Sequence, residues 1–288
     1  MQTVAVLGTG TMGQGIAQIA AQKGLHARVF DADPARAKAA VEAISTQLGK
    51  LVEKGKIDAG AREQTLARLA VADSLEAAVN DVHVVIEAVP ESMELKVDLF
   101  RRVVAAAPAA ALLGSNTSSL SLTELGARIG APDRTIGLHF FNPPPVMELL
   151  EIVRGLGTSE DTLARALALA ATLGKTPIVV RDVPGFATSR LGVILGCEAM
   201  RMLEQGVAST VDIDRAMELG YRHPMGPLKL TDLVGLDVRL AILEHLTREV
   251  GEQFRPPPLL RQMVRAGKLG KKTGEGFYLW KDGQPVAK

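Results

Sequence analysis

The sequence predicts an α/β protein in two parts: an N-terminal domain with a mainly parallel sheet, followed by an all-α C-terminal domain. Short apolar segments rich in β-branched residues alternate with helical segments up to about residue 182, which is typical of a parallel sheet covered by helices. A glycine-rich turn joins the first of these strands to the first helix. After residue 184 the strand pattern stops, and helical segments divided by Gly and Pro continue to about residue 276.

The elements of the first part are predicted from buried strand patterns and from helix end signals. The segment TVAVLG is apolar on both faces, as in a buried parallel strand. Asp33 is a good N-cap, and Pro34 suits the first position of the helix that follows. The predicted strands are residues 3–8, 26–30, 82–89, 111–114, 135–140, 149–153 and 176–181. The predicted helices are residues 12–23, 92–106, 121–129 and 159–173, and a long stretch from residue 34 with a break near residues 55–60.

The second part is expected to contain helices only. The predicted helical segments are residues 184–205, 209–219, 235–250 and 257–266, and Ser209 with Asp212 resembles a capping box at one helix start. The change of pattern at Asp182-Val183-Pro184-Gly185 predicts domains at residues 1–183 and 184–288. Leu236, Leu240 and Leu243 form an apolar stripe that we expect to need cover from another surface.

Composition excludes several classes of protein. The chain has 288 residues, and 33 basic and 32 acidic side chains give a net charge of +1, which argues against a nucleic-acid-binding protein. No uncharged apolar run reaches the ~18 residues that span a bilayer, so no membrane partner is expected. Cys197 is the single cysteine, which excludes an intrachain disulfide, and the first residues do not form a signal-peptide pattern. We therefore expect a protein of a reducing compartment, either the cytoplasm or an organelle matrix after import, and of these we predict the cytoplasm.

The turn Gly8-Thr9-Gly10-Thr11-Met12-Gly13 matches the G-x-G-x-x-G pattern of dinucleotide-binding proteins. It follows a predicted strand and opens a predicted helix, which is the context that gives the pattern its meaning. Gly8, Gly10 and Gly13 allow a tight turn, close approach to a pyrophosphate and close helix–strand packing. The amide groups at the helix start, near Thr11 and Met12, favour phosphate binding. A purely structural turn between strand and helix is the alternative interpretation.

Asp31 ends the second predicted strand, 18 residues after Gly13. A carboxylate at this place can bind the ribose hydroxyls of an adenosine and would repel a 2′-phosphate, so NAD is favoured over NADP. Arg28 and Arg36 lie close by in the sequence and weaken that preference. Alternatively, Asp31 caps a helix, although Asp33 is better placed to do so.

His139 and Glu151 are the candidate catalytic pair. The segment His139-Phe140-Phe141-Asn142-Pro143 lies at the end of a predicted strand, where open α/β sheets bind ligands. Histidine can take a proton at neutral pH, as oxidation of an alcohol requires. Glu151 stands in the apolar segment 149–153, where a carboxylate needs a partner, and it could orient the imidazole. The alternatives are a hydrogen-bonded core histidine and a glutamate bound to a backbone amide.

The segment Asn116-Thr117-Ser118-Ser119 ends another predicted strand at the same edge of the sheet. It offers hydroxyl and amide groups to a substrate or to a nicotinamide. The same residue types could equally form a helix-capping loop. No cluster of Cys and His has the spacing of metal ligands, so no metal is expected.

The sequence resembles the 3-hydroxyacyl-CoA dehydrogenase family, especially its bacterial 3-hydroxybutyryl-CoA dehydrogenase branch. The resemblance covers nearly the whole chain, and its segments occur in the family's order and at its spacing. They are VAVLGTGTMGQGIAQ, VIEAVPE, SNTSSL, GLHFFNPPPVMELLEIV, DVPGF, HPMGP, DLVGLD and GKKTGEGFY. The resemblance implies a Rossmann-like N-terminal domain, a helical C-terminal domain that dimerises, NAD as cofactor and an acyl-CoA thioester as substrate.

The resemblance also implies residue roles. His139 is expected to be the catalytic base and Glu151 its orienting partner, with Ser118 and Asn142 beside the reacting carbon and the nicotinamide. The remaining positions implied by the family are Glu91, Lys96 and Lys272 near the cofactor, and Lys54 in contact with CoA. Lys50, one turn before Lys54, is a further candidate for the CoA phosphates, and a solvated helix face is the alternative for both lysines.

One substrate position departs from the family pattern. The segment PGFATSR has Ser189 where the family often has Asn. Serine is shorter and offers one hydroxyl in place of an amide, so it reaches a substrate through a water or leaves a larger pocket. The departure puts the preferred acyl-chain length in doubt.

The expected reaction is the reversible oxidation of an (S)-3-hydroxyacyl-CoA, of short chain such as 3-hydroxybutyryl-CoA, to a 3-oxoacyl-CoA, as in the β-oxidation of fatty acids. Two other functions remain open: an NAD-dependent dehydrogenase of a sugar acid or another small hydroxy acid, and a non-catalytic NAD-binding protein. The lysines at positions 50 and 54 favour a CoA ester, because its phosphates need cations.

Overall fold

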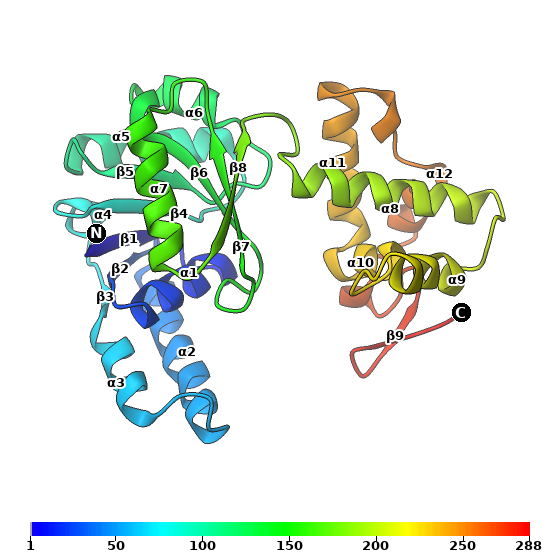
Figure 1. Ribbon diagram of the computed structural model, residues 1–288, viewed down its shortest axis with the longest axis horizontal. Coiled ribbons are helices and arrows are strands. Elements are labelled where there is room, and N and C mark those ends of the chain that lie inside the picture. The colour runs from blue at the N-terminus through cyan, green and yellow to red at the C-terminus, as the bar shows by residue number, and fades with distance from the viewer. Residues whose placement is uncertain (1) are drawn as a thin grey trace. The chain divides into compact units, whose positions relative to one another are not determined.

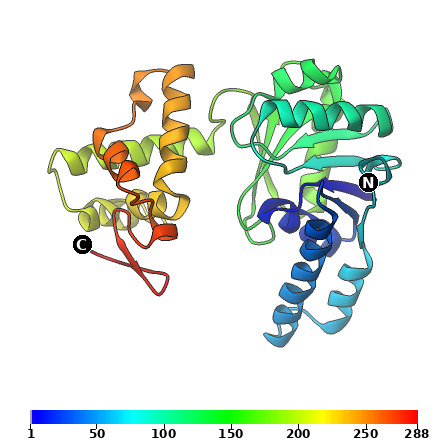
Figure 2. The ribbon, with the colours of Figure 1, turned by 180° about the vertical axis from the view of Figure 1, so that it is seen from behind.

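Figure 1 and Figure 2 show the computed structural model from opposite sides, and the structure describes residues 2–288. The chain divides into two compact units, residues 1–183 and 184–288, and each is described by itself. Within residues 2–288, no helix combines the length and the apolar character that crossing a membrane requires.

The first unit is built on a sheet of eight strands within the described chain, in the order β3-β2-β1-β4-β5-β6-β7-β8. The strands are β1 (Thr3–Leu7), β2 (His26–Phe30), β3 (Leu69–Val71), β4 (Val84–Glu87), β5 (Leu112–Ser115), β6 (Thr135–Phe140), β7 (Leu149–Arg154) and β8 (Thr176–Arg181). Every neighbouring pair is parallel except β6 and β7, which are antiparallel. The strand order reverses at β1, and such reversals create the crevice where doubly wound sheets bind ligands.

The helices of this unit are α1 (Thr11–Gln22), α2 (Pro34–Glu53), α3 (Ala59–Ala67), α4 (Leu75–Val79), α5 (Met93–Ala106), α6 (Leu122–Ile129) and α7 (Glu160–Thr172), with a 3₁₀ turn η1 (Pro132–Arg134). Asp33 caps α2, and its carboxylate accepts a hydrogen bond from the Ala35 N–H. Figure 1 shows α2 and α3 side by side, extending beyond the sheet. The apolar side chains of β1, β4 and β6 are fully buried, so the sheet is the centre of the core.

The predicted α/β architecture is confirmed, and the structure adds two short elements. Strand β3 and helix α4 were not predicted, because three and five residues are too short for a hydrophobic period to show. The break in the long helical stretch is real and separates α2 from α3.

The second unit is helical, as predicted, and also holds a small hairpin. Its helices are α8 (Thr188–Glu204), α9 (Thr210–Arg215), a π-helical turn η2 (Ala216–Gly220), α10 (Pro227–Val234), α11 (Leu236–Glu249), η3 (Glu252–Phe254), α12 (Pro258–Arg265) and η4 (Lys271–Thr273). Helix α10 was not predicted, although Pro227 occupies its first turn. Leu236 and Leu243 are fully buried in this unit's own core, which corrects the expectation that their stripe needs cover from elsewhere.

The hairpin is the exception to the expected all-α domain. Strands β9 (Leu279–Lys281) and β10 (Gln284–Val286) pair antiparallel around Asp282 and Gly283, which both have positive φ angles. Asp-Gly between two short strands is a known hairpin signal, so the sequence held this information. The buried Asp232 of α10 ties the preceding segment to the helices, because its carboxylate accepts hydrogen bonds from the Phe277 and Tyr278 N–H groups.

Candidate active site

The glycine-rich turn lies between β1 and α1, at the reversal of the strand order. A Cβ on Gly13 would stand 1.8 Å from the Gly8 carbonyl oxygen, so only glycine permits this packing. Gly8 itself has a φ of 92°, in the region that favours glycine. Gly10 is the N-cap of α1, no side chain caps the helix there, and a Cβ on it would meet nothing within 4 Å. The turn therefore presents open space and amide donors at a helix N-terminus, which fits a pyrophosphate.

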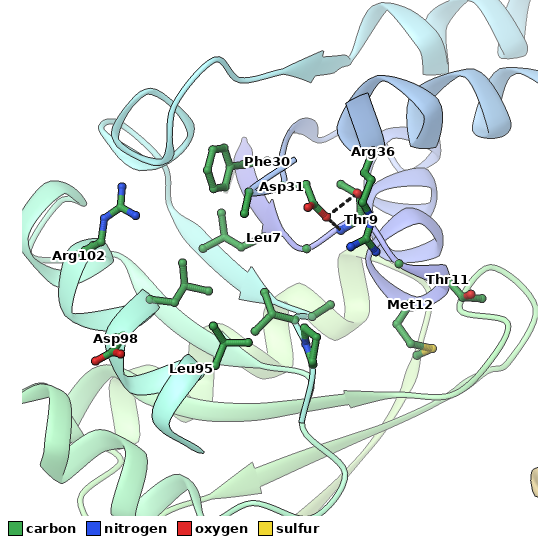
Figure 3. A pocket seen from close by; sticks show the side chains of 17 residues that line it. Leu7, Thr9, Thr11, Met12, Phe30, Asp31, Arg36, Leu95, Asp98 and Arg102 are labelled. Atoms are coloured by element: carbon green, nitrogen blue, oxygen red, sulfur yellow. Dashed lines mark hydrogen bonds between the residues drawn. The ribbon is translucent and has the colours of Figure 1, made fainter. Parts of the chain in front are cut away.

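A cavity of about 700 Å³ opens beside this turn (Figure 3). Of the residues predicted to bind a cofactor, Gly8, Gly10, Thr11, Met12 and Asp31 line it. Its other lining residues are Leu7, Thr9, Phe30, Ala32, Arg36, Ala88, Val89, Pro90, Leu95, Asp98, Leu99 and Arg102. The mostly apolar lining with a few polar groups suits a nucleoside.

Asp31 is fixed toward the glycine-rich turn. Its Oδ2 accepts hydrogen bonds from the Thr9 N–H at 2.9 Å and from the Thr9 hydroxyl at 2.7 Å, and its Oδ1 accepts one from the Asp33 N–H. Partial burial raises the pKa of Asp31, but the bonds from Thr9 and Asp33 and the nearby Arg36 outweigh it and hold the pKa below its usual value. Asp31 is therefore an anion in the cavity wall, as an acceptor for ribose hydroxyls must be.

Helix α5 supplies the part of the cavity that the sequence reasoning missed. Leu95, Asp98, Leu99 and Arg102 all face it. These positions follow the i, i+3, i+4, i+7 spacing of one helix face. That spacing is a usable signal, but only after the helix is known to lie beside the glycine-rich turn.

His139 and Glu151 meet across the single antiparallel strand pair of the described sheet. The register of β6 and β7 places the two residues directly opposite each other. His139 Nδ1 lies 2.7 Å from Glu151 Oε2, and the side chain of Glu151 is fully buried. The ring of Phe141 packs against the imidazole, with 4.6 Å between ring centroids. The structure thus joins the two residues proposed to form the catalytic pair.

The turn after β5 carries Ser118 at the neighbouring strand end. The Asn116 side-chain oxygen accepts a hydrogen bond from the Phe140 N–H at 2.9 Å, which links this turn to the strand that bears His139. Ser118 is exposed, and its N–H donates to Glu91 Oε1 at 3.0 Å. Asn116 therefore has a connecting role, and Ser118 keeps an accessible side chain at the edge of the sheet.

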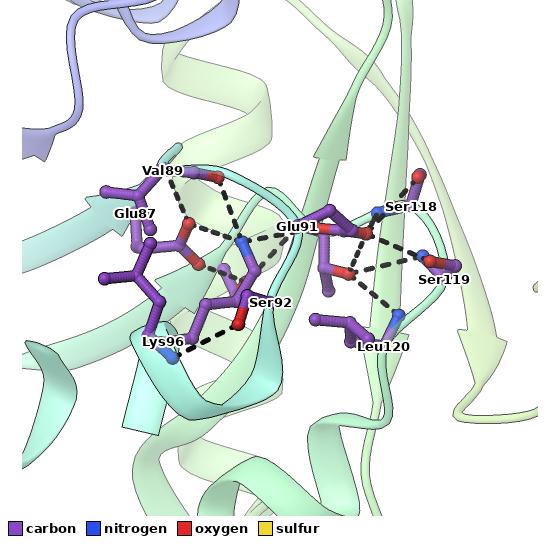
Figure 4. Close-up of polar contacts among 11 residues, drawn as sticks. Glu87, Val89, Glu91, Ser92, Lys96, Ser118, Ser119 and Leu120 are labelled. Atoms are coloured by element: carbon purple, nitrogen blue, oxygen red, sulfur yellow. Dashed lines mark hydrogen bonds and ion pairs between the residues drawn. The ribbon is translucent and has the colours of Figure 1, made fainter. Parts of the chain in front are cut away.

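Glu91 and Lys96 belong to one polar network beneath this turn (Figure 4). The Lys96 side chain is 1% exposed, with its Nζ 3.3 Å from Glu91 Oε2 and 2.5 Å from Glu87 Oε1. Such burial leaves the ammonium facing carboxylates of its own chain. Glu91 is the more exposed partner, with a side chain that is 37% accessible.

A second cavity, of about 380 Å³, lies between α1, α2 and the segment after β6. Asn142 and Lys50 both line it, which unites one predicted active-site residue with one predicted CoA-binding residue. Lys54 is the exposed C-cap of α2 and is not among the lining residues. Gln14, Gln18 and Gln47 also line this cavity, and the sequence analysis gave none of them a role.

Two predicted site residues lie in the second unit. Ser189 is half-buried in the first turn of α8. Lys272 is exposed on η4 and forms an ion pair with Asp237, with Nζ 2.6 Å from Oδ1. Their roles in binding substrate and cofactor stay predictions. Among residues 2–288, no group of three or more His, Cys, Asp or Glu side chains is arranged to hold a metal ion.

Comparison with protein families matches both units. Residues 3–183 match the model described as 3-hydroxyacyl-CoA dehydrogenase, NAD binding domain, and residues 185–280 match the model of the C-terminal domain of the same enzymes. The chain belongs to the 3-hydroxyacyl-CoA dehydrogenase family. NAD is thus the cofactor of the first unit, and the cradle at Gly10 and the carboxylate of Asp31 fit it.

Relatives of the 3-hydroxyacyl-CoA dehydrogenase family match along almost the whole chain. A probable 3-hydroxybutyryl-CoA dehydrogenase of Bacillus subtilis is 43% identical over 279 residues, which are 96% of this chain and 97% of that protein. The 3-hydroxyadipyl-CoA dehydrogenase of Escherichia coli is 40% identical, over 98% of this chain and 59% of its own length. The crystal structure of (S)-3-hydroxybutyryl-CoA dehydrogenase from Ralstonia eutropha superposes with a TM-score of 0.94 at 41% identity, over 98% of this chain and all of that one.

Proposed function

We propose that this protein catalyses the reversible, NAD-dependent oxidation of short-chain (S)-3-hydroxyacyl-CoA thioesters, such as 3-hydroxybutyryl-CoA, to 3-oxoacyl-CoA. The observation that carries the proposal is the His139–Glu151 pair at the carboxyl end of β6, in a family whose first domain binds NAD. The names of the relatives from B. subtilis and R. eutropha support the choice of substrate.

In the proposed mechanism His139 accepts the proton of the C3 hydroxyl at Nε2. The Nδ1–H group donates to the buried carboxylate of Glu151, which fixes the tautomer and stabilises the imidazolium once it forms. Ser118 and Asn142 bind and orient the substrate beside His139. Bound NAD supplies the acceptor for the hydride that leaves C3. In the reverse direction His139 returns its proton to the ketone oxygen.

The cavity that Lys50 and Asn142 share is the proposed path of the CoA moiety. An ammonium at Lys50 suits the phosphates of CoA, and Asn142 stands at the end of the cavity that adjoins β6. Lys54 is proposed to contact the same moiety farther out. Ser189 is proposed to contact the acyl group, and Glu91, Lys96 and Lys272 are proposed to act near the cofactor.

A homodimer is the proposed assembly, formed by the second unit. Exposed apolar side chains gather on its helices: Leu191 and Leu195 on α8, Leu230, Leu233 and Val234 on α10, and Val238 on α11. Helices α8 and α10 pack against each other, and we expect the interface where these adjoining helices carry exposed apolar side chains. An apolar region of this kind marks an interaction surface.

We also propose a cytoplasmic location.

The alternative function, a dehydrogenase of a small hydroxy acid, would use the same histidine, but its substrate would be a free acid and not a CoA thioester. The test measures kcat/KM for 3-oxoacyl-CoA esters of increasing chain length, with NADH and with NADPH. Free 3-oxo acids serve as competing substrates in the same assay. We expect the highest values with short CoA esters and NADH. Faster turnover of the free acids would overturn the choice of substrate, and NADH binding without turnover of any of them would favour a non-catalytic protein.

A further inference from the structure

Glu87, the last residue of β4, is a buried carboxylate that the proposed mechanism does not use. Its side chain has no solvent exposure, although a buried carboxylate is costly without partners. Lys96, itself 1% exposed, contributes its ammonium 2.5 Å from Glu87 Oε1. Burial raises the pKa of Glu87, and the lysine opposes that effect. The desolvation cost of a buried ion pair can exceed the energy that the pair gains, so stability alone does not explain why Glu87 and Lys96 are buried together.

Glu87 reaches the turn after β5 through Ser115. The Ser115 hydroxyl donates to Glu87 Oε2 at 2.6 Å, and the same hydroxyl oxygen accepts a hydrogen bond from the Thr117 N–H at 3.3 Å. Ser115 is fully buried and Thr117 is 1% exposed, so water does not compete for these groups. This first route fixes the backbone at the start of the turn.

A second route leads from Glu87 to the same turn through Lys96 and Glu91. The Lys96 ammonium bridges the two carboxylates, and Glu91 Oε1 accepts a hydrogen bond from the Thr117 hydroxyl at 2.6 Å. The Ser118 N–H donates to the same oxygen. The two routes both start at Glu87 and meet at Thr117, so together they form a closed ring of contacts.

The donors of the turn all meet Glu91 at one oxygen, Oε1, while the Lys96 ammonium faces the other, Oε2. Partial burial of Glu91 raises its pKa, but Lys96 and the donors of the turn outweigh this and hold the pKa below the usual value. The Ser119 hydroxyl also donates to Glu91 Oε1, at 3.1 Å. The position of the Lys96 ammonium therefore decides where this acceptor stands, and Glu87 holds the ammonium from the opposite side.

We propose that Glu87 is a positioning residue for the dehydrogenase reaction: through Ser115 and through Lys96–Glu91 it sets the conformation of the turn that presents Ser118 to the substrate. The inference rests on the proposed role of Ser118. The Asn116–Phe140 hydrogen bond ties the first residue of the turn to the strand of His139, so the ring at Glu87 completes the placement of Ser118 relative to that strand.

A double-mutant cycle tests the proposal. Glu87→Gln keeps the shape of the side chain and removes the charge that holds Lys96. We expect it to lower kcat/KM for acetoacetyl-CoA by about 10–100-fold, which is what a small misplacement of a reacting group costs. In a Ser118→Ala background the same substitution should cost less than about 2-fold, because the group that it positions is gone. Glu94→Gln is the control with the same change of side chain, since Glu94 is exposed on α5, the helix that carries Lys96, and it should leave activity unchanged.

The outcomes of this cycle distinguish a positioning role of Glu87 from a general structural effect and from an error in the role of Ser118. An equal loss from Glu87→Gln in both backgrounds would show a general structural effect and overturn the proposal, as would no loss at all. A Ser118→Ala variant with normal kcat/KM would overturn both the role of Ser118 and this proposal. Loss in Ser118→Ala without loss in Glu87→Gln would reject the positioning role alone. If Glu87→Gln does not fold, Ser115→Ala cuts only the first route, and the same cycle with that variant decides.

Discussion

At the scale of single residues, His139 is held by a residue of the opposite strand and by one just after its own strand. Glu151 fixes Nδ1 from the opposite strand, and the Phe141 ring packs on the imidazole. A carboxylate with no solvent exposure binds an N–H more strongly than one in water, because the surrounding dielectric is low. The pair therefore combines a defined tautomer with a defined ring orientation, as a general base requires.

Replacing His139 by Gln should separate chemistry from binding. We expect His139→Gln to lower turnover by at least ~100-fold, because the base that takes the hydroxyl proton is lost. The affinity for NADH should stay the same, since the residue does not line the nucleotide cavity. NADH absorbance with acetoacetyl-CoA measures the turnover, and NADH fluorescence measures binding. Normal turnover would remove His139 from the mechanism.

The direction of ketone reduction gives a pH prediction for the same residue. His139 must carry a proton before it can protonate the ketone oxygen, so the reduction rate should fall as the pH rises. The measurement is kcat for acetoacetyl-CoA reduction across pH 5–9, under conditions where hydride transfer limits the rate. A rate that does not change over this range would contradict the assignment.

Glu91 makes stability depend on acid pH. Its pKa in the folded protein lies below the usual value of 4.5, so its stabilising contribution is present above pH 4.5 and is lost as the pH falls through the folded-state pKa. Glu91→Gln should therefore lower the free energy of unfolding most at neutral pH. The difference from the natural protein should shrink below about pH 4. Urea unfolding followed by circular dichroism checks this, and a difference that grows in acid would refute it.

At the scale of elements, the β1–α1 connection shows how glycines serve different needs within one turn. Gly13 packs against the Gly8 carbonyl and Gly8 packs against the backbone of Ala88, whereas the space over Gly10 is open. Gly8 and Gly13 are therefore required for packing within the fold, whereas Gly10 leaves room for a ligand. Helix α5 adds the opposite wall of the cavity with four residues on one face.

Alanine substitutions should distinguish the glycine required for packing from the glycine that leaves room for NAD. In Gly13→Ala the new Cβ would stand 1.8 Å from the Gly8 carbonyl oxygen, so we expect a loss of stability of ~1–3 kcal/mol, typical of overpacking. Gly10→Ala should keep stability, because its φ of −64° suits an L residue and the space is open. It should still weaken NADH binding by about 10-fold or more, through loss of phosphate hydrogen bonds. Thermal unfolding and NADH titration measure the two effects, and equal NADH affinity in Gly10→Ala would argue against the cradle.

At the scale of the whole molecule, the second unit combines a closed core with an apolar surface. The face of α11 with Leu236 and Leu243 belongs to that core, while Leu195 of α8 and Leu233 of α10 stay exposed. The surface thus differs from the stripe that the sequence suggested. An association between copies through this region would give the helices their missing cover.

The proposed dimer predicts the effect of a charge on this surface. We expect Leu195→Glu to shift the protein toward monomers, because association would bury the new carboxylate without a partner. Leu156→Glu is the control: Leu156 is 93% exposed in the first unit, outside the proposed interface. Sedimentation equilibrium of the natural protein and both variants provides the measurement. A natural protein that is monomeric at micromolar concentration would reject the dimer.

The sequence by itself determined the alternation of strands and helices, the phosphate cradle and the acidic residue at Asp31. These features are local, because each depends on side-chain periodicity or on a glycine pattern within about 30 residues. Such patterns can be recognised in the sequence before the fold is known. The sequence also indicated His139 and Glu151 as a candidate pair, and the resemblance to a family added the positions near the cofactor at Glu91, Lys96 and Lys272. Short elements such as β3 and α10 escaped, because they have little period of their own.

Only the tertiary structure decided which distant residues meet. The antiparallel register of β6 and β7 sets His139 opposite Glu151, and a register shifted by one residue would turn the two side chains to opposite faces. The place of α5 beside the glycine-rich turn and the ring from Glu87 to Thr117 likewise join segments far apart in the sequence. Such contacts depend on how whole elements pack, and packing is a property of the complete chain rather than of any segment.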